Sequence, residues 1–416
     1  MTTTPEPHPA PGAGTGGGGR RHTVPGWLAA IAVVLVAVNL RPGASSVGPV
    51  LEEVRSGLAM SGATAGVLTA LPGFAFGAVG AVAVLLSRRV GMTAGILLGV
   101  LAISLGLLLR AGTTSTPLFL LLSLLALAGM AIGNVLVPAW IKRHSRDGGV
   151  RLMTVYGTVL ILGGALGSAT AAPVSQVAGG WWAALGMWGV VAALALLPWA
   201  FLATGERRAA RGGRPTMLRP NARMRHSPTA VALTVLFGTQ AMNAYVQFGW
   251  LPQIYRDAGL SAVYAGGLMA LLTSLGVVGG LVMPTVIDRA ATLAPHLVAM
   301  GTLMVAGYLG LLLWPTTLPW LWAVLLGLGG FSFPTAIALI TARTRDPQVT
   351  AQLSGFVQPV GYVLAAAGPL AVGMMHAATG GWTAVLVLLM LSGIALVLAG
   401  LRVARPVLVD DELSPR

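Results

Sequence analysis

The chain has 416 residues, of which 56% are hydrophobic and only 9% are charged, whereas soluble domains usually carry about 25% charged residues. This composition excludes a disordered chain, a fibre and an ordinary soluble domain. The absence of cysteine excludes disulfides and cysteine-ligated zinc or iron–sulfur sites. The formal net charge is +14, and the positions of those charges are more informative than their sum.

Twelve apolar segments each approach the roughly 20 residues that a transmembrane helix needs. They are long and continuous rather than alternating, which favours helices over the strands of a β-barrel. The sequence therefore predicts an all-α integral membrane protein with twelve transmembrane helices. In chain order, the segments cover 27–50, 61–87, 91–110, 117–141, 151–176, 181–203, 228–252, 262–285, 296–314, 319–342, 351–376 and 382–403.

The segments fall into two groups of six. Residues 27–203 and 228–403 are expected to form two six-helix bundles, joined by a basic cytoplasmic linker over 204–227. Residues 1–26, which are rich in proline and glycine, predict a disordered cytoplasmic tail. Residues 404–416 predict a second cytoplasmic tail.

Basic residues gather in every second loop, with the largest group in the linker 204–227. The intervening loops hold only Arg55, Arg110 and Arg256. By the positive-inside rule, this asymmetry predicts a cell-membrane protein with both termini in the cytoplasm. Contact with anionic lipid explains the basic linker better than nucleic-acid binding, because no aromatic platform accompanies the arginines.

The two halves repeat at an offset of about 200 residues. Gly57-Leu58 and Ala65-Gly66 correspond to Gly259-Leu260 and Ala265-Gly266. Later positions also correspond, as Pro138 does with Pro334. An even number of spans in each half keeps the two halves parallel, and two such halves are the layout of major-facilitator transporters.

Four segments carry a resemblance to the cyanate/2-nitroimidazole permease family of the major facilitator superfamily. They are Asn39-Leu40-Arg41-Pro42 with Ser45 to Pro49, Gly133 to Pro138, Leu251 to Ser261, and Leu353 to Pro369. The resemblance covers residues 27–403 and implies two parallel six-helix halves. It also implies alternating access to a central site lined by spans one, four, seven and ten.

Arg41 is the main candidate for binding a solute. It lies 14 residues past Trp27, about 21 Å along a helix and thus near the middle of the membrane. An arginine there costs at least about 2.5–3.5 kcal/mol and cannot lose its proton. Its planar fork suits an anion, and none of the twelve segments contains an aspartate or glutamate. The alternative is an arginine satisfied by helix carbonyls.

Polar side chains in other spans are further candidates for substrate binding. Gln240, Asn243 and Gln247 recur at three and four residues, so they share one face of a helix. That face either lines the central path or makes hydrogen bonds between helices. The remaining candidates are Asn39, Ser45, Asn134, Gln358 and Tyr362.

Several prolines and one charged motif are candidates for the hinges and gates of the protein. Pro42 with Gly43, and Pro49, interrupt the first span and are expected to act as a hinge or gate. The superfamily motif between spans two and three normally contains an aspartate, which Ser87 to Gly91 lacks. Its counterpart in the second half keeps Asp288-Arg289, so the resemblance implies an asymmetric gate.

These features predict a secondary active or facilitative transporter of a small anionic or polar solute, such as a cyanate-like ion. The alternative is an efflux carrier for nitroimidazole-type or weakly acidic drugs, and a distant one is a non-transporting receptor or scaffold. No enzyme is expected, because no nucleophile motif or metal cluster is evident. We expect no cofactor, metal or nucleic-acid partner. A monomer in the bilayer is the working expectation.

Overall fold

The computed structural model describes residues 25–144, 150–207 and 222–413. Most of the predicted tails and linker therefore lies outside the described residues. Within them the chain is helical, and no strand is present.

The N-terminal half begins with a broken span. Its pieces are α1 (Gly26–Asn39), α2 (Pro42–Ser45), the short 3₁₀ helix η1 (Gly48–Val50) and α3 (Leu51–Gly57). Five long helices complete this half: α4 (Gly62–Val90), α5 (Met92–Ala111), α6 (Thr116–His144), α7 (Val150–Val177) and α8 (Trp181–Arg207).

The C-terminal half has the same plan. After η2 (Ala222–His226) come α9 (Pro228–Asp257), α10 (Ala262–Arg289) and α11 (Ala294–Leu313). The next span is split into α12 (Pro319–Gly329) and α13 (Ser332–Ala342). It is followed by α14 (Pro347–Thr379), α15 (Thr383–Ala404) and the short α16 (Val409–Leu413).

Eleven helical segments of the described chain are long and apolar enough to cross a membrane. The twelfth predicted span is α9, whose 30 residues are sufficient in length. It is less apolar than the others because it carries Gln240, Asn243 and Gln247, which are buried inside the protein. The twelve predicted spans thus match the helices of the structure.

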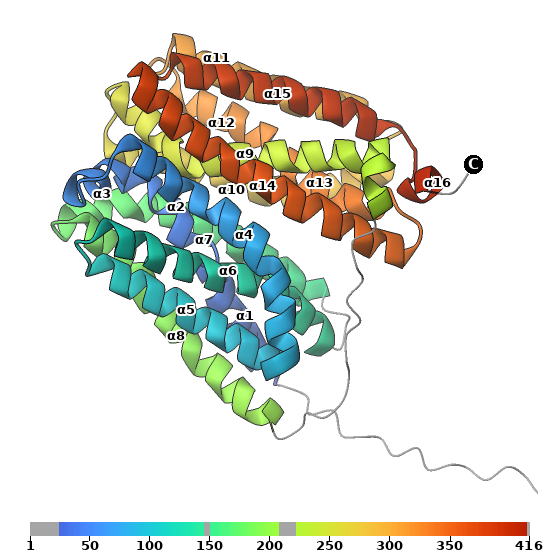
Figure 1. The fold of residues 1–416 in the computed structure, drawn as a ribbon, viewed down its shortest axis with the longest axis horizontal. Helices are drawn as coiled ribbons and strands as arrows, with labels where there is room; N and C mark the ends of the chain where they lie inside the picture. The colour runs from blue at the N-terminus through green and yellow to red at the C-terminus, as the bar shows by residue number, and fades with distance from the viewer. Residues whose placement is uncertain (1–24, 145–149, 208–221, 414–416) are drawn as a thin grey trace, which may run out of the picture.

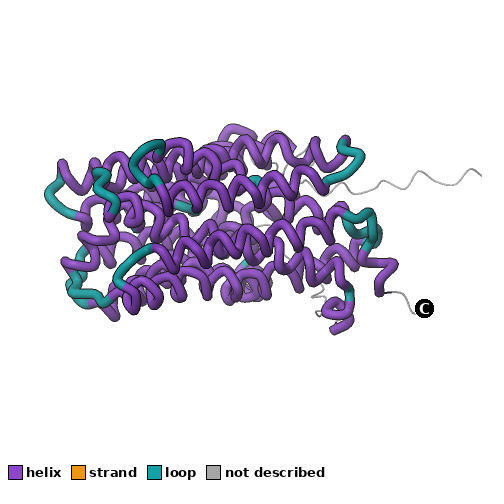
Figure 2. The backbone as a smooth tube through the Cα atoms, turned by 90° about the horizontal axis from the view of Figure 1, so that it is seen from above, coloured by secondary structure: helices purple, strands orange, loops and turns teal. Residues whose placement is uncertain are grey.

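The two halves stand side by side, with their long helices running along a common direction (Figures 1 and 2). They meet mainly where α4 packs on α14 and α7 packs on α10. We name the two ends of the molecule by their charges. The "basic end" carries Lys142, Arg143, Arg289, Arg343 and Arg402, and the "ion-pair end" carries Glu53 and Arg256 (on the side of α3 in Figure 1).

Small residues bring the halves together toward the ion-pair end. Gly66 of α4 lies against Gly373 of α14, and a Cβ added at Gly73 would lie 2.7 Å from the Cα of Ala366. The backbone carbonyl of Phe248 in α9 lies directly against Gly48. Helices without side chains at the contact can approach very closely. The structure is therefore closed at the ion-pair end.

The C-terminal helix α16 forms a clasp across the basic end of the C-terminal half. The Glu412 carboxylate accepts hydrogen bonds from the Thr229 amide at 3.0 Å and from Arg402 at 2.6 Å. It also contacts the hydroxyl of Ser227, the N-cap of α9. Asp410 accepts the backbone N–H groups just before α14. The clasp thus joins the ends of α9, α13, α14 and α15.

Candidate functional site

The break in the first span places Arg41 between two helices. Proline has no backbone N–H and fits best at the first position of a helix. Accordingly α1 ends at Asn39, and Pro42 starts α2. Arg41 stands before it with φ −127° and ψ −36°, outside helical geometry. The sequence position of the proline therefore determines where the arginine leaves the helix.

The Arg41 side chain is only partly buried. Its guanidinium carbon lies 5.8 Å from the centre of the Phe76 ring, within the range of a cation–π contact. Within the described chain no hydrogen bond or ion pair to a protein group is found for this guanidinium. Arg41 thus keeps its N–H donors free beside the Phe76 ring.

Aromatic rings from both halves surround this arginine. Phe76 comes from α4, Tyr245 from α9 and Tyr362 from α14. The ring centres are 6.5 Å apart for Phe76 and Tyr245, 6.0 Å for Phe76 and Tyr362, and 6.4 Å for Tyr245 and Tyr362. Because the three rings belong to different halves, any rocking of the halves changes their spacing around Arg41.

A second polar pair lies near Arg41 in the N-terminal half. The Tyr156 hydroxyl is 3.4 Å from Oδ1 of Asn134, whose amide nitrogen donates to the Met130 carbonyl. Asn134 remains partly exposed. Gln358, another predicted binding residue, is also partly exposed and donates to Ser354 one turn away. Gln358 retains its amide oxygen for a further partner, and Asn134 retains the second N–H of its amide.

The amides of α9 point into their own half. Gln240 accepts a hydrogen bond from Ser332 at 2.7 Å. Asn243 donates to Ser392 at 2.9 Å and accepts from Tyr308 at 2.7 Å. All of these side chains are buried. Of the two alternatives that the sequence left open for this face of the helix, the structure shows hydrogen bonding between helices.

Gln247 completes this network by donating to the Tyr308 hydroxyl at 2.9 Å. Tyr245 lies two residues after Asn243, about 200° around the helix, and so faces the other way. One face of α9 therefore secures the helix in its bundle, while the opposite face presents a phenol to Arg41.

Two predicted residues near the break support the backbone. Ser45 donates to the Gly164 carbonyl of α7 at 2.8 Å. Asn39 donates to the Leu35 carbonyl at 2.7 Å, and its own Oδ1 is buried without a partner. The Ser45 contact thus connects α2 to α7, the Asn39 contact stays within α1, and neither side chain bonds to Arg41.

The predicted gate residues lie at both ends of the molecule. Pro49 is in η1, and its carbonyl accepts a hydrogen bond from Arg256 at 3.3 Å. Asp288 and Arg289 are exposed where α10 ends at the basic end. Among the described residues, Asp288 and Arg289 therefore form no ion pair in this conformation, which is closed at the ion-pair end.

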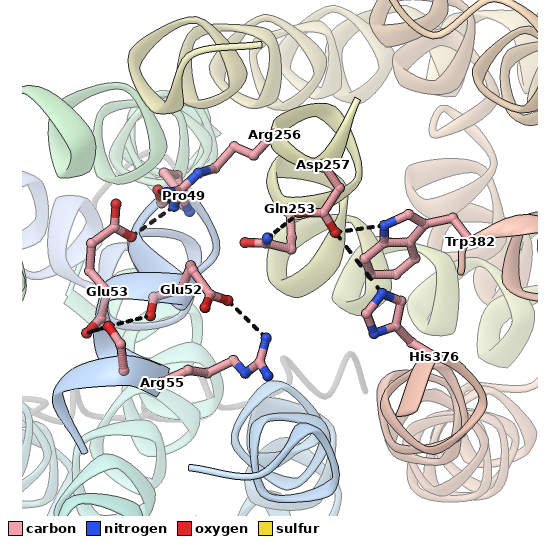
Figure 3. Close-up of polar contacts among 10 residues, drawn as sticks. Pro49, Glu52, Glu53, Arg55, Gln253, Arg256, Asp257, His376 and Trp382 are labelled. Carbon is pink, nitrogen blue, oxygen red and sulfur yellow. Dashed lines mark hydrogen bonds and ion pairs between the residues drawn. The ribbon is translucent and has the colours of Figure 1, made fainter. Parts of the chain in front are cut away.

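A salt bridge joins the halves at the ion-pair end (Figure 3). Arg256 of α9 lies 2.7 Å from Glu53 of α3. Glu52 pairs locally with Arg55 at 2.8 Å. Because Glu53 and Arg256 belong to different halves, opening of this end must separate them.

A further polar cluster lies beside this salt bridge (Figure 3). Asp257 accepts hydrogen bonds from Gln253 at 2.6 Å and from the Trp382 indole at 2.8 Å. His376 lies 4.0 Å from the same carboxylate and stacks 4.0 Å from the Trp382 ring centre. These contacts join the ends of α9, α14 and α15.

Arg110 was counted among the loop charges, although the predicted segment 91–110 ends on it. The charge pattern assigned it to a loop, but it lies in the last turn of α5 and is 1% exposed. Its Nη2 donates to the Gly43 carbonyl at 3.1 Å. The signal available in the sequence was the apolar run that continues up to it, Leu107 to Leu109.

Comparison with known proteins agrees with this architecture. The family model described as Major Facilitator Superfamily matches residues 31–369. A solved structure of a D-xylose–proton symporter superposes with a TM-score of 0.72 at 14% identity, over 92% of this chain and 98% of that chain.

Three curated relatives match almost end to end. The chain is 33% identical to the uncharacterised transporter YycB of Bacillus subtilis (strain 168), over 90% of this chain and 92% of the relative. It is 30% identical to the cyanate transport protein CynX of Escherichia coli (strain K12), over 85% and 91%. It is also 30% identical to the 2-nitroimidazole transporter of the same organism, over 84% and 88%. On the matched length and the shared fold, the chain belongs to the major facilitator superfamily of membrane transporters.

Proposed function

We propose that this transporter moves a small anionic or polar solute by alternating access and that Arg41 binds the solute at the centre. The observation that supports this most is an arginine at the break of the first span that has no hydrogen-bond or ion-pair partner among the described residues. It stands where the two halves meet, so rocking of the halves would expose it to each side in turn.

The surroundings of Arg41 favour an anion or an electron-rich group. A buried cation needs a partner of opposite charge or several acceptors, and none of the described ion pairs involves Arg41. Tyr245 and Tyr362, whose rings pack beside Phe76, offer hydroxyl donors in this region. Asn134 and Gln358 offer amides, and we assign these two to orienting the solute. Gln240, Asn243 and Gln247 are assigned to holding α9.

The names of the relatives agree with this chemistry. Cyanate is a small linear anion, and the nitro group of 2-nitroimidazole carries two electron-rich oxygens. Both offer acceptors to a guanidinium fork. We therefore propose solutes of this size and polarity for the present chain as well.

By the positive-inside rule, the charge asymmetry supports a cytoplasmic basic end, and the closed ion-pair end would then face outward. An uncoupled monovalent anion entering a cell works against about 2.3 kcal/mol per 100 mV. Uncoupled transport of such an anion would therefore favour export, or import with exchange. A neutral solute avoids this penalty.

The test is thermal unfolding of the detergent-purified protein with cyanate, nitrate, thiocyanate, small carboxylates and a nitroimidazole. A ligand at 100 times its dissociation constant stabilises the folded state by about 2.7 kcal/mol. We expect one class to raise the unfolding temperature of the wild type and of Arg405→Gln, an exposed control at the basic end. Arg41→Gln should lose the shift. An equal shift in Arg41→Gln contradicts the proposal.

A second candidate function is efflux of nitroaromatic drugs. The flat rings of Phe76, Tyr245 and Tyr362 around the arginine favour it, because such rings stack on planar aromatic ligands. Cells lacking the protein should then become more sensitive to a nitroimidazole. Unchanged sensitivity, together with a thermal shift for small inorganic anions only, removes this candidate.

A further inference from the structure

A second arginine is buried near the break of the first span. Arg110 is 1% exposed and donates from Nη2 to the Gly43 carbonyl at 3.1 Å. Its Nη1 lies 3.4 Å from the Ser123 hydroxyl, a long contact, and its Nε has no partner. The guanidinium carbon lies 5.8 Å from the centre of the Phe119 ring.

The charge of Arg110 has no carboxylate to balance it. None of the ion pairs among the described residues includes Arg110. A buried ion usually costs several kcal/mol unless a counter-charge compensates it. Arginine cannot escape this cost by deprotonation. The protein therefore holds a full positive charge in its interior, and a bound anion would compensate the cost of burying it.

The bond to Gly43 does not by itself account for an arginine. The change from α2 to η1 removes the normal helical donor from this carbonyl, because the Val47 amide donates to Ala44 instead. A neutral donor such as an amide would satisfy a carbonyl equally well. The permanent charge and the unpartnered Nε remain to be explained.

A small cavity lies beside Arg110. Its volume is about 20 Å³, enough for one water-sized particle. Gly43, Thr69 and Ser123 line it from the N-terminal half, and Tyr245 and Phe248 line it from α9. Tyr245 also flanks Arg41, so the cavity and the central site share this wall.

We propose that this cavity is an occluded subsite for a small monovalent inorganic anion, held by Arg110 on the ion-pair side of Arg41. Residues of both halves line the cavity, so opening of the ion-pair end would expose it. The volume of the cavity fits a halide-sized counter-ion rather than a triatomic anion such as cyanate. Binding at Arg110 does not require that Arg41 binds the cargo, so this inference stands apart from the proposed function.

The experiment uses the full-length protein in detergent with gluconate as the only anion. Chloride or cyanate then replaces gluconate at constant ionic strength while the unfolding temperature is recorded. We expect chloride to stabilise both the wild type and Arg41→Gln. Arg110→Gln should bind it at least about tenfold more weakly, a loss of roughly 1.4 kcal/mol. Arg110→Lys keeps the charge and should retain part of the effect.

Several outcomes overturn the proposal. One is a wild type that is equally stable in gluconate, chloride and cyanate. Another is a chloride effect that persists unchanged in Arg110→Gln. If Arg110→Gln does not fold, wild-type crystals grown in bromide decide the question, because anomalous scattering beside Arg110 is expected and its absence refutes the subsite. Stabilisation by cyanate but not by chloride also overturns it, because the cavity is too small for a triatomic anion.

Discussion

Gly73→Ala should open the ion-pair end. Gly73 lies in α4 at the contact with α14, where an added Cβ would come 2.7 Å from the Cα of Ala366 and 2.8 Å from its backbone nitrogen. Ordinary contacts begin at 3.4 Å. The two helices must therefore separate by about 0.7 Å or more before the methyl group fits.

The size of the effect follows from this overlap. Overpacking costs about 1–3 kcal/mol, and the cost falls only on the state in which α4 and α14 touch. Alanine also favours the helix over glycine by about 1 kcal/mol, but this gain applies equally to both states. The ratio of open to closed molecules at the ion-pair end should therefore rise by about 5- to 150-fold.

Distances between two spin labels report the opening. The chain has no cysteine, so labels on Ser56→Cys in α3 and Ala258→Cys after α9 are the only reactive thiols. In Gly73→Ala, the fraction of molecules with the longer distance between the two labels should increase. Gly280→Ala is the matched control, because Gly280 has no atom within 4 Å of an added Cβ. An unchanged distance distribution in Gly73→Ala, or an equal change in the control, refutes the reasoning.

Three further predictions concern other contacts. Glu53→Gln should raise the ratio of open to closed molecules, measured with the same labels, by only about 2- to 5-fold, since partly exposed ion pairs are worth about 0.5–1 kcal/mol; a larger rise than in Gly73→Ala contradicts this ranking. Burial would raise the pKa of Glu412, but hydrogen bonds from Ser227 and Thr229 outweigh it and hold the pKa below 4.5. The stabilisation by Glu412 is therefore complete above about pH 4.5 and is lost as pH falls through the lower pKa of the folded state. The unfolding temperature should thus fall less steeply with acid in Glu412→Gln than in the wild type; parallel profiles of the two proteins refute the clasp. Asn243→Leu should cost about 1–3 kcal/mol of stability, because it leaves the Tyr308 hydroxyl without its acceptor; weaker solute binding without a loss of stability would place Asn243 in the site instead.

The sequence predicted the twelve spans because lipid imposes a simple rule on composition. A run of about 20 apolar residues has few other uses, and basic loops separate such runs clearly. Pro42 likewise indicated the break in the first span, since proline removes a helical hydrogen bond. The break between α12 and α13 was not predicted, because glycine is common in continuous membrane helices.

The directions of the polar side chains could not be predicted in the same way. Periodicity placed Gln240, Asn243 and Gln247 on one face, but it cannot say whether that face meets a path or a neighbouring helix. The answer depends on Tyr308 and Ser392, which lie far along the chain. The rotation of α9 about its own axis also determines that Tyr245 lies on the side of Arg41, and this rotation depends on how the helices of the bundle pack.

The clasp made by α16 also sets the order in which the C-terminal half is completed during synthesis. Glu412 contacts Ser227, which precedes it by 185 residues. At about 5–20 residues per second, the ribosome needs roughly 10 to 40 s to pass from one to the other. During that interval Ser227 already caps α9, but the Thr229 amide and hydroxyl lack the Glu412 carboxylate as their acceptor. These contacts form only after α15 has been synthesised, because α16 follows it in the chain.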